Sequence, residues 1–180
     1  MDDPVRTTSR LLLRLPTLAD QAFAAALYAC PEVVAHRPVP TPDTPQQSAK
    51  RLCDDIEHWG RLGFGRWAIE ASGRLIGFGG LTLSEKFAGL NLSYHLHPEI
   101  WRRGFATEFG RAALEFAFAV LGADRVMGLV RPANHASRRV LEKCGFEFVR
   151  DVDLHGAPAD LYRAMHPGAL PWLGRRDQAK

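Results

Sequence analysis

Residues 97–107 read HPEIWRRGFAT, and they join a strand predicted over residues 91–97 to a helix predicted over residues 104–121. The first amides of a helix lack intrahelical partners, and the helix dipole adds a partial positive charge there. Gly104 lets the backbone come close to a bulky ligand, and the two arginines before it add positive charge. The stretch therefore predicts a site for a phosphate-bearing ligand. An ordinary turn with solvated arginines fits the same residues, which match neither GxGxxG nor GxxxxGK[ST].

The segments on either side of this turn alternate between helix and strand signals. Turn residues and hydrophobic spacing predict strands over 10–15, 66–71, 74–83, 91–97, 125–130, 147–153 and 159–164, and helices over 17–29, 44–60 and 134–144 besides 104–121. We expect one mixed α/β sheet with helices on both faces. The helix over 104–121 is a crossover, so the strands that flank it should be parallel neighbours, with any ligand at the carboxyl end of the first.

Composition excludes several classes of protein. The chain has 180 residues and a net charge of +3, which suits a phosphate-bearing ligand but is too weak to indicate nucleic acid. Its three cysteines, Cys30, Cys53 and Cys144, are far apart and form no CxxC pair, so we expect no disulfide framework and a reducing, cytoplasmic setting. No apolar run reaches the roughly 18 residues that span a bilayer, and the polar N-terminus is not typical of a signal peptide.

Four pieces of the chain, in order, resemble the GNAT superfamily of acyl-CoA N-acyltransferases, and within it the ribosomal-protein N-terminal acetyltransferase (Rim-type) branch. The turn resembles the cofactor motif of that superfamily, [QR]xxGx[GA], with Trp101 in the first place and Gly104 and Ala106 in the others. The pieces are TSRLLLRLPTLAD (8–20), FGRWAIE with GRLIGFGGL (64–70 and 73–81), LSYHLHPEIWRRGFATE (92–108) and NHASRRVLEKCGFEFV (134–149). The resemblance covers residues 8–166, which we expect to form a single N-acetyltransferase domain, with residues 167–180 as a C-terminal tail.

The resemblance implies the GNAT fold, a mostly antiparallel mixed sheet with one splayed parallel strand pair, and acetyl-CoA as cosubstrate, without a metal. It implies that the pyrophosphate lies on the backbone of the turn and that the pantetheine arm passes between the splayed strands, near the backbone of Leu96 and beside Asn134. The implied cofactor-binding residues are Leu96, Arg102, Arg103, Gly104, Phe105, Ala106, Thr107 and Asn134.

The sequence departs from the branch at the base. Members of the branch often carry a Glu where this chain has Asn91, and an amide cannot accept the proton of an ammonium. His95, on the same strand, is our candidate base because its ordinary pKa near 6.5 suits the task; packing or hydrogen bonding is the alternative role. His97 shares its face and the pair could ligate a metal, although no third ligand is apparent. Glu70 is a weaker candidate base.

The departing thiolate needs a proton, and the sequence offers one hydroxyl for it. Many superfamily members use a Tyr where this chain has Leu141. Ser137, three residues after Asn134, is the alternative donor; its other reading is a polar residue of the first helical turn. We interpret Cys144, at the far end of the same helix, as a core residue.

The expected activity is transfer of an acetyl group from acetyl-CoA to a primary amine by direct attack, with the α-amine of a protein N-terminus as one acceptor. A small-molecule amine (polyamine, amino sugar or antibiotic) is the alternative acceptor, and a non-catalytic acyl-CoA binding module is the alternative class. Acceptor contacts are expected from residues 31–45 and 153–160. Four aspartates (Asp43, Asp151, Asp153 and Asp160) could attract a cationic amine, or they could be ordinary solvated carboxylates. We expect no nucleic-acid or membrane partner, and a monomer or a homodimer.

Overall fold

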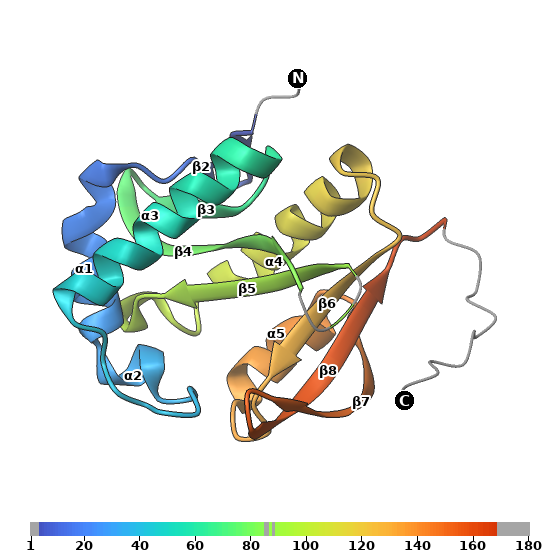
Figure 1. Cartoon of the computed structure of the whole chain (residues 1–180). Coiled ribbons are helices and arrows are strands. Elements are labelled where there is room, and N and C mark those ends of the chain that lie inside the picture. The colour runs from blue at the N-terminus through green and yellow to red at the C-terminus, as the bar shows by residue number, and fades with distance from the viewer. Residues whose placement is uncertain (1–3, 85–86, 88, 169–180) are drawn as a thin grey trace.

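The computed structural model describes residues 4–84, 87 and 89–168 and contains an eight-stranded sheet of order β1-β2-β3-β4-β5-β6-β8-β7 (Figure 1). The strands are β1 (Arg6–Thr7), β2 (Leu11–Arg14), β3 (Arg66–Ala71), β4 (Arg74–Leu83), β5 (Leu90–Leu96), β6 (Arg125–Val130), β7 (Glu147–Leu154) and β8 (Ala157–Met165). The pair β5 and β6 is parallel and the other neighbours are antiparallel, which confirms the predicted mixed sheet.

The helices begin and end largely at the residues that the sequence indicates. They are η1 (Leu18–Asp20), α1 (Gln21–Ala29), α2 (Pro31–Val34), α3 (Pro45–Leu62), η2 (Pro98–Ile100), α4 (Phe105–Glu115), the π-helical η3 (Phe116–Val120) and α5 (His135–Lys143). Thr44 caps α3 in a capping box with Gln47, and Asn134 caps α5. Gly63 ends α3 in the left-handed conformation, so the helix continues past residue 60, where the sequence predicted its end.

The two faces of the sheet carry separate hydrophobic clusters. On β3, Trp67 and Ile69 belong to the cluster that includes α4, whereas Ala68 packs with α1 and α3. Successive side chains of a strand point to opposite faces, so α4 covers one face while α1 and α3 cover the other, as Figure 1 shows. On β5, this places Tyr94 and Leu96 on the α4 face, and Ser93 and His95 on the α1 and α3 face.

Some outcomes differ from the sequence-based expectations. The strand β1 is not predicted, because two residues are too few to show alternation. The helix expected over 104–121 is present, but its last turn is π-helical. The division into a domain over 8–166 and a tail over 167–180 stays a prediction, and residues 169–180 of that tail lie outside the described residues.

Candidate active site

The predicted phosphate turn is a tight, left-handed connection between η2 and α4. Both Arg102 (φ 63°) and Gly104 (φ 81°) adopt positive φ. The amide of Glu108 donates to the carbonyl of Gly104 at 3.1 Å and begins the helical ladder, so the amides of residues 105–107 precede it. The indole of Trp101 donates to the carbonyl of Leu96 at 2.8 Å and ties the turn to the end of β5.

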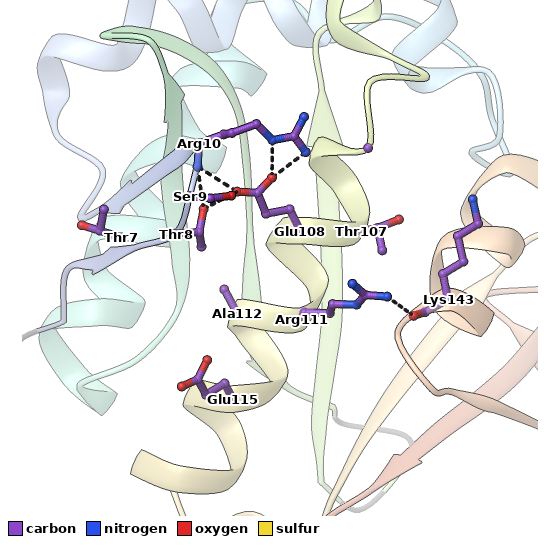
Figure 2. A pocket seen from close by; sticks show the side chains of 11 residues that line it. Thr7, Thr8, Ser9, Arg10, Thr107, Glu108, Arg111, Ala112, Glu115 and Lys143 are labelled. Carbon is purple, nitrogen blue, oxygen red and sulfur yellow. Dashed lines mark hydrogen bonds and ion pairs between the residues drawn. The ribbon is translucent and has the colours of Figure 1, made fainter.

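A second contact joins Arg10, in the turn between β1 and β2, to Glu108 on α4 (Figure 2). The Arg10 guanidinium bonds the Glu108 carboxylate at 2.5 and 2.6 Å and donates to the carbonyl of Arg103 at 2.9 Å. It also lies 4.5 Å from the ring centroid of Phe105. Burial raises the pKa of Glu108, but hydrogen bonds from Thr8, Arg10 and Ser9 outweigh it and lower the pKa below its usual range. Arg10 thus joins three residues of the turn region.

The Arg10 contact borders an open pocket of about 590 Å³ along α4. Gly104 is part of its wall, and a Cβ built on Gly104 would meet only the Arg10 guanidinium, at 3.4 Å. The pocket is lined by Thr7, Thr8, Ser9, Arg10, Gly104, Thr107, Glu108, Arg111, Ala112, Glu115 and Lys143. Arg102 and Arg103 are exposed next to it. The turn therefore presents backbone amides and cationic side chains to solvent on one side of the N-terminus of α4.

The parallel strands β5 and β6 separate before either of them ends. Only residues 90–92 of β5 are in register with β6, opposite Val126, Met127 and Gly128. From Ser93 to Leu96, β5 keeps its pairing with β4 alone among the described strands. The predicted splay is therefore present, and it places Leu96 beside a gap in the sheet that leads to the phosphate turn.

Ser137 and Asn134 lie together at the N-terminus of α5. The Asn134 side chain accepts from the amide of Ser137 at 3.1 Å, and the hydroxyl of Tyr94 donates to Oγ of Ser137 at 3.3 Å. Burial raises the pKa of Tyr94 to about 12, so the phenol keeps its proton at neutral pH. Sequence reasoning missed Tyr94, although its alternation with His95 on the strand places it on the opposite face from His95, toward α4.

His95 lies on the opposite face, with its ring 5.4 Å from that of Tyr28. Burial, together with the positive charges of Arg66, Arg37 and Arg51, lowers the pKa of His95 to about 3. Its Nδ1 is buried and has no hydrogen-bond partner among the described residues. The imidazole is therefore neutral, and its low basicity counts against the role of general base; the role stays a prediction.

The other side chains that the sequence analysis singled out make contacts of their own. Glu70 is held by Arg14 at 2.6 Å, and His97 accepts from the amide of Glu99 at 3.4 Å. Burial raises the pKa of the Cys144 thiol, which contacts the carbonyl of Thr107 at 3.5 Å, in agreement with a core role. Leu141 is buried, as a core residue would be.

Two of the aspartates expected to attract a cationic acceptor are already neutralised. Asp43 is paired with both Arg37 and Arg51, and Asp160 with Arg138 at 2.6 Å. Burial raises the pKa of Asp43, but the two arginines outweigh it and lower the pKa. The carboxylate of Asp43, in the loop before α3, and that of Asp160, on β8, are therefore both engaged in ion pairs within the protein.

Two further properties concern the described part of the chain as a whole. Nowhere in residues 4–84, 87 and 89–168 do three or more His, Cys, Asp or Glu side chains gather as they would around a metal ion. Within the same residues, every helix is too short or too polar to pass through a bilayer.

Comparison with known proteins gives one consistent family. The model of the acetyltransferase (GNAT) domain matches residues 10–147. The uncharacterized N-acetyltransferase YoaA of Bacillus subtilis is 31% identical over 147 residues, which cover 80% of this chain and 83% of that protein. An acetyltransferase structure from Agrobacterium tumefaciens aligns with a TM-score of 0.80 at 26% identity, over 92% of this chain and 96% of that one. The aminoglycoside acetyltransferase AAC(6')-Ib, solved in complex with coenzyme A, has a TM-score of 0.74 at 17% identity, over 86% and 94% of the two chains, and shows the likeness of fold.

Proposed function

The chain belongs to the GNAT family of acetyltransferases, and we propose that it transfers the acetyl group of acetyl-CoA to a primary amine that attacks directly. The observation that carries the proposal is the family match over residues 10–147, which includes the left-handed turn at Gly104. A non-catalytic acyl-CoA binding module would share this turn, and the absence of the usual Glu at Asn91 and of the usual Tyr at Leu141 favours it. The polar pair of Tyr94 and Ser137 beside the splayed strands favours the enzyme.

The residues of the turn fit a coenzyme diphosphate. A helix N-terminus offers free amides and the positive end of the dipole, and both favour a bound anion. Gly104 keeps the approach open, because only the Arg10 side chain lies near the place of a Cβ. The proposed diphosphate ligands are the amides of residues 102–107 and the side chains of Arg102 and Arg103. When bound, the coenzyme supplies an acetyl thioester, which an amine can attack.

The remaining proposed roles belong to side chains and amides around the gap between β5 and β6. The Leu96 amide, at the end of β5, would donate to the thioester carbonyl, an oxyanion-type contribution. Asn134 would lie along the pantetheine arm. Ser137, which accepts from Tyr94 at 3.3 Å, would donate a proton or hydrogen bond to the leaving sulfur. His95, held neutral, would accept a hydrogen bond from the amine through its free Nδ1.

The acceptor is the finer part of the proposal. The resemblance to the Rim-type branch favours the α-amine of a protein N-terminus. The alternative is a small-molecule amine, which the structure of AAC(6')-Ib with ribostamycin and coenzyme A illustrates for that protein. The pairing of Asp43 and Asp160 with arginines weakens the case for a polycationic acceptor such as an aminoglycoside.

Two measurements test the proposal. Excess acetyl-CoA should raise the melting temperature of the purified protein, because a ligand that binds only the native state stabilises it. A panel of N-terminal peptides, amino acids, polyamines and amino sugars, read out by free thiol release, should then identify an acceptor. An unchanged melting temperature would contradict the binding of acetyl-CoA. Tight binding of acetyl-CoA without thiol release on any amine would instead identify a binding module.

A further inference from the structure

The face of the sheet away from α4 carries a cluster of arginines around two buried rings. Arg66 donates to Oγ of Ser93 at 2.9 Å, two residues before His95 on the same face of β5. The guanidinium carbons of Arg51 and Arg37 lie 4.9 and 5.7 Å from the ring centroid of Tyr28, which in turn contacts His95. We call Tyr28, Arg37, Arg51, Arg66 and His95 the arginine face.

Several polar atoms of the arginine face are buried without a partner. Oη of Tyr28, Nδ1 of His95 and Nε of Arg66 have no hydrogen-bond partner among the described residues, and Tyr28 is only 1% exposed. Buried polar groups in folded proteins are nearly always hydrogen-bonded, to protein or to water. Unpaired atoms of three residues in one cluster therefore indicate a place for a polar ligand or ordered water.

The charge of the arginine face is positive. Arg37 and Arg51 share one carboxylate, that of Asp43. The other nearby carboxyl is that of Asp55, whose pKa is raised by burial, against the opposing effect of Arg66 and Arg51. Burial is the main cause that lowers the pKa of His95, and the charges of Arg66, Arg37 and Arg51 lower it further. The surroundings of His95 therefore disfavour a bound cation. Within the described residues, the side chain of Arg66 donates to Ser93 and forms no ion pair.

The arginine face lies where an acceptor would reach the proposed reaction centre. The pairing of β5 with β6 stops at Leu92, and His95 stands on β5 beside the gap that follows. Tyr94 and Ser137 occupy the α4 and α5 side of this strand. An amine that approached the gap from the other side would meet the face of β5 that carries His95 and Ser93, and the Arg66 guanidinium bonds to Ser93 there.

We propose that the arginine face selects an amine acceptor that carries a carboxylate close to its amine, and that it rejects polycations. The inference rests on the proposed acetyl transfer and names the acceptor class of that same site. A carboxylate accepts two parallel hydrogen bonds from a guanidinium, which fits the free donors of Arg66 better than any neutral group. The Tyr28 hydroxyl could donate to the same carboxylate, while Nδ1 of His95 accepts from the amine. Both a free amino acid and a peptide with an acidic first residue have this chemistry.

Matched acceptors test the proposal on the wild-type protein. Tyrosine and tyramine differ by the carboxylate, and the amidated peptides Glu-Ala-Ala and Gln-Ala-Ala differ by one side-chain charge. We expect the carboxylate-bearing member of at least one pair to have about a tenfold higher kcat/KM, as expected for a charge-assisted contact. Preference in the first pair alone indicates free amino acids, and preference in the second indicates peptides. Equal values in both pairs, or a higher value for spermidine, overturn the proposal.

Calorimetric binding to the protein saturated with coenzyme A separates this inference from acetyl transfer itself. If the carboxylate-bearing member binds more tightly but no acetyl is transferred, the selection stands and the transferase proposal fails. If neither pair shows a difference in binding, the selection fails, whatever the transfer activity.

Variants assign the selection to its residues. Arg66→Gln should abolish the preference, Arg66→Lys should restore part of it, and Arg74→Gln, at an exposed arginine on β4, should keep it. Stabilisation by acetyl-CoA shows that each variant is folded, and Arg51→Gln replaces Arg66→Gln if the latter does not fold. A preference that survives in both Arg66→Gln and Arg51→Gln overturns the assignment.

Discussion

The hydroxyl of Tyr94 on β5 donates to Oγ of Ser137 on α5 at 3.3 Å, across the face that the cofactor arm would follow. Burial raises the pKa of Tyr94 to about 12, so the phenol remains a donor throughout the neutral range. With its own proton free, Ser137 can donate to a third group while it accepts from Tyr94. The two hydroxyls therefore form a short chain of donors that ends beside the gap between β5 and β6.

Replacement of Ser137 should slow turnover more than it weakens cofactor binding. We expect Ser137→Ala to lower kcat by about 100-fold, the lower end of the range for a lost proton donor, with acetyl-CoA affinity within about threefold of wild type. Thiol release and calorimetry measure the two quantities. Tyr94→Phe should add little to Ser137→Ala, because residues that act as one chain are not additive. Unchanged turnover of Ser137→Ala would remove the donor role.

A carboxylate at position 104 should prevent cofactor binding, because it would face the diphosphate. At saturating acetyl-CoA, about 100 times the Kd, the wild-type protein should gain about 2.7 kcal/mol of stability. We expect Gly104→Glu to gain none. Gly156→Glu is the matched control, since Gly156 also has a positive φ (75°) and open space around it. The idea fails if both variants are stabilised as the wild type is.

Loss of the Arg10 guanidinium should loosen the phosphate turn. We expect Arg10→Met to weaken acetyl-CoA binding by about fivefold, because the contacts with the carbonyl of Arg103 and the ring of Phe105 disappear. Arg10 is 47% exposed, so its ion pair should account for only about 1 kcal/mol of stability. Calorimetry and thermal melts separate the two effects, with Arg74→Met as control. A variant that melts earlier but binds acetyl-CoA normally would limit Arg10 to a structural role.

The pH dependence of activity should contain no step from His95. Burial and the charges of Arg66, Arg37 and Arg51, opposed by Asp43, lower the pKa of His95 to about 3, so it is protonated only below the range of the assay. Between about pH 5.5 and 9.5, kcat/KM should rise with deprotonation of the acceptor amine alone. The curve of His95→Gln should be lower and have the same shape. A step near pH 6.5 that is present in the wild type and absent in the variant would restore His95 as the base.

Much of the fold could be predicted from the sequence because its signals are local. The capping box of Thr44 and Gln47 marks the start of a helix, and Ser72-Gly73 marks a hairpin; both lie within four residues of the feature that they specify. The position of the phosphate turn follows from the same kind of signal, since Gly104 and the strand before it are neighbours in the chain.

The missing parts depend on contacts between residues far apart in the sequence. Arg10 and Glu108 are separated by 98 residues, and nothing near either one indicates the other. The role proposed for Tyr94 depends on its hydrogen bond to Ser137, which lies 43 residues later in the chain. His95 had a suitable ordinary pKa, but the arginines that lower it come from α3, β3 and the loop after α2. Burial and electrostatic environment are properties of the assembled molecule, so a residue type alone could not reveal them.

The short parallel pairing between β5 and β6 also has a mechanical consequence. Three registered residue pairs join the half of the sheet that contains β1–β5 to the half that contains β6–β8, whereas β4 and β5 share seven. A strand pair with few hydrogen bonds, such as β5 and β6, resists shear and twist less than the neighbouring pairs do. Thermal bending of the sheet should therefore concentrate between β5 and β6. An extended chain that bound along the unpaired part of β5 would supply the hydrogen bonds that β6 does not make there, and it would stiffen the whole molecule.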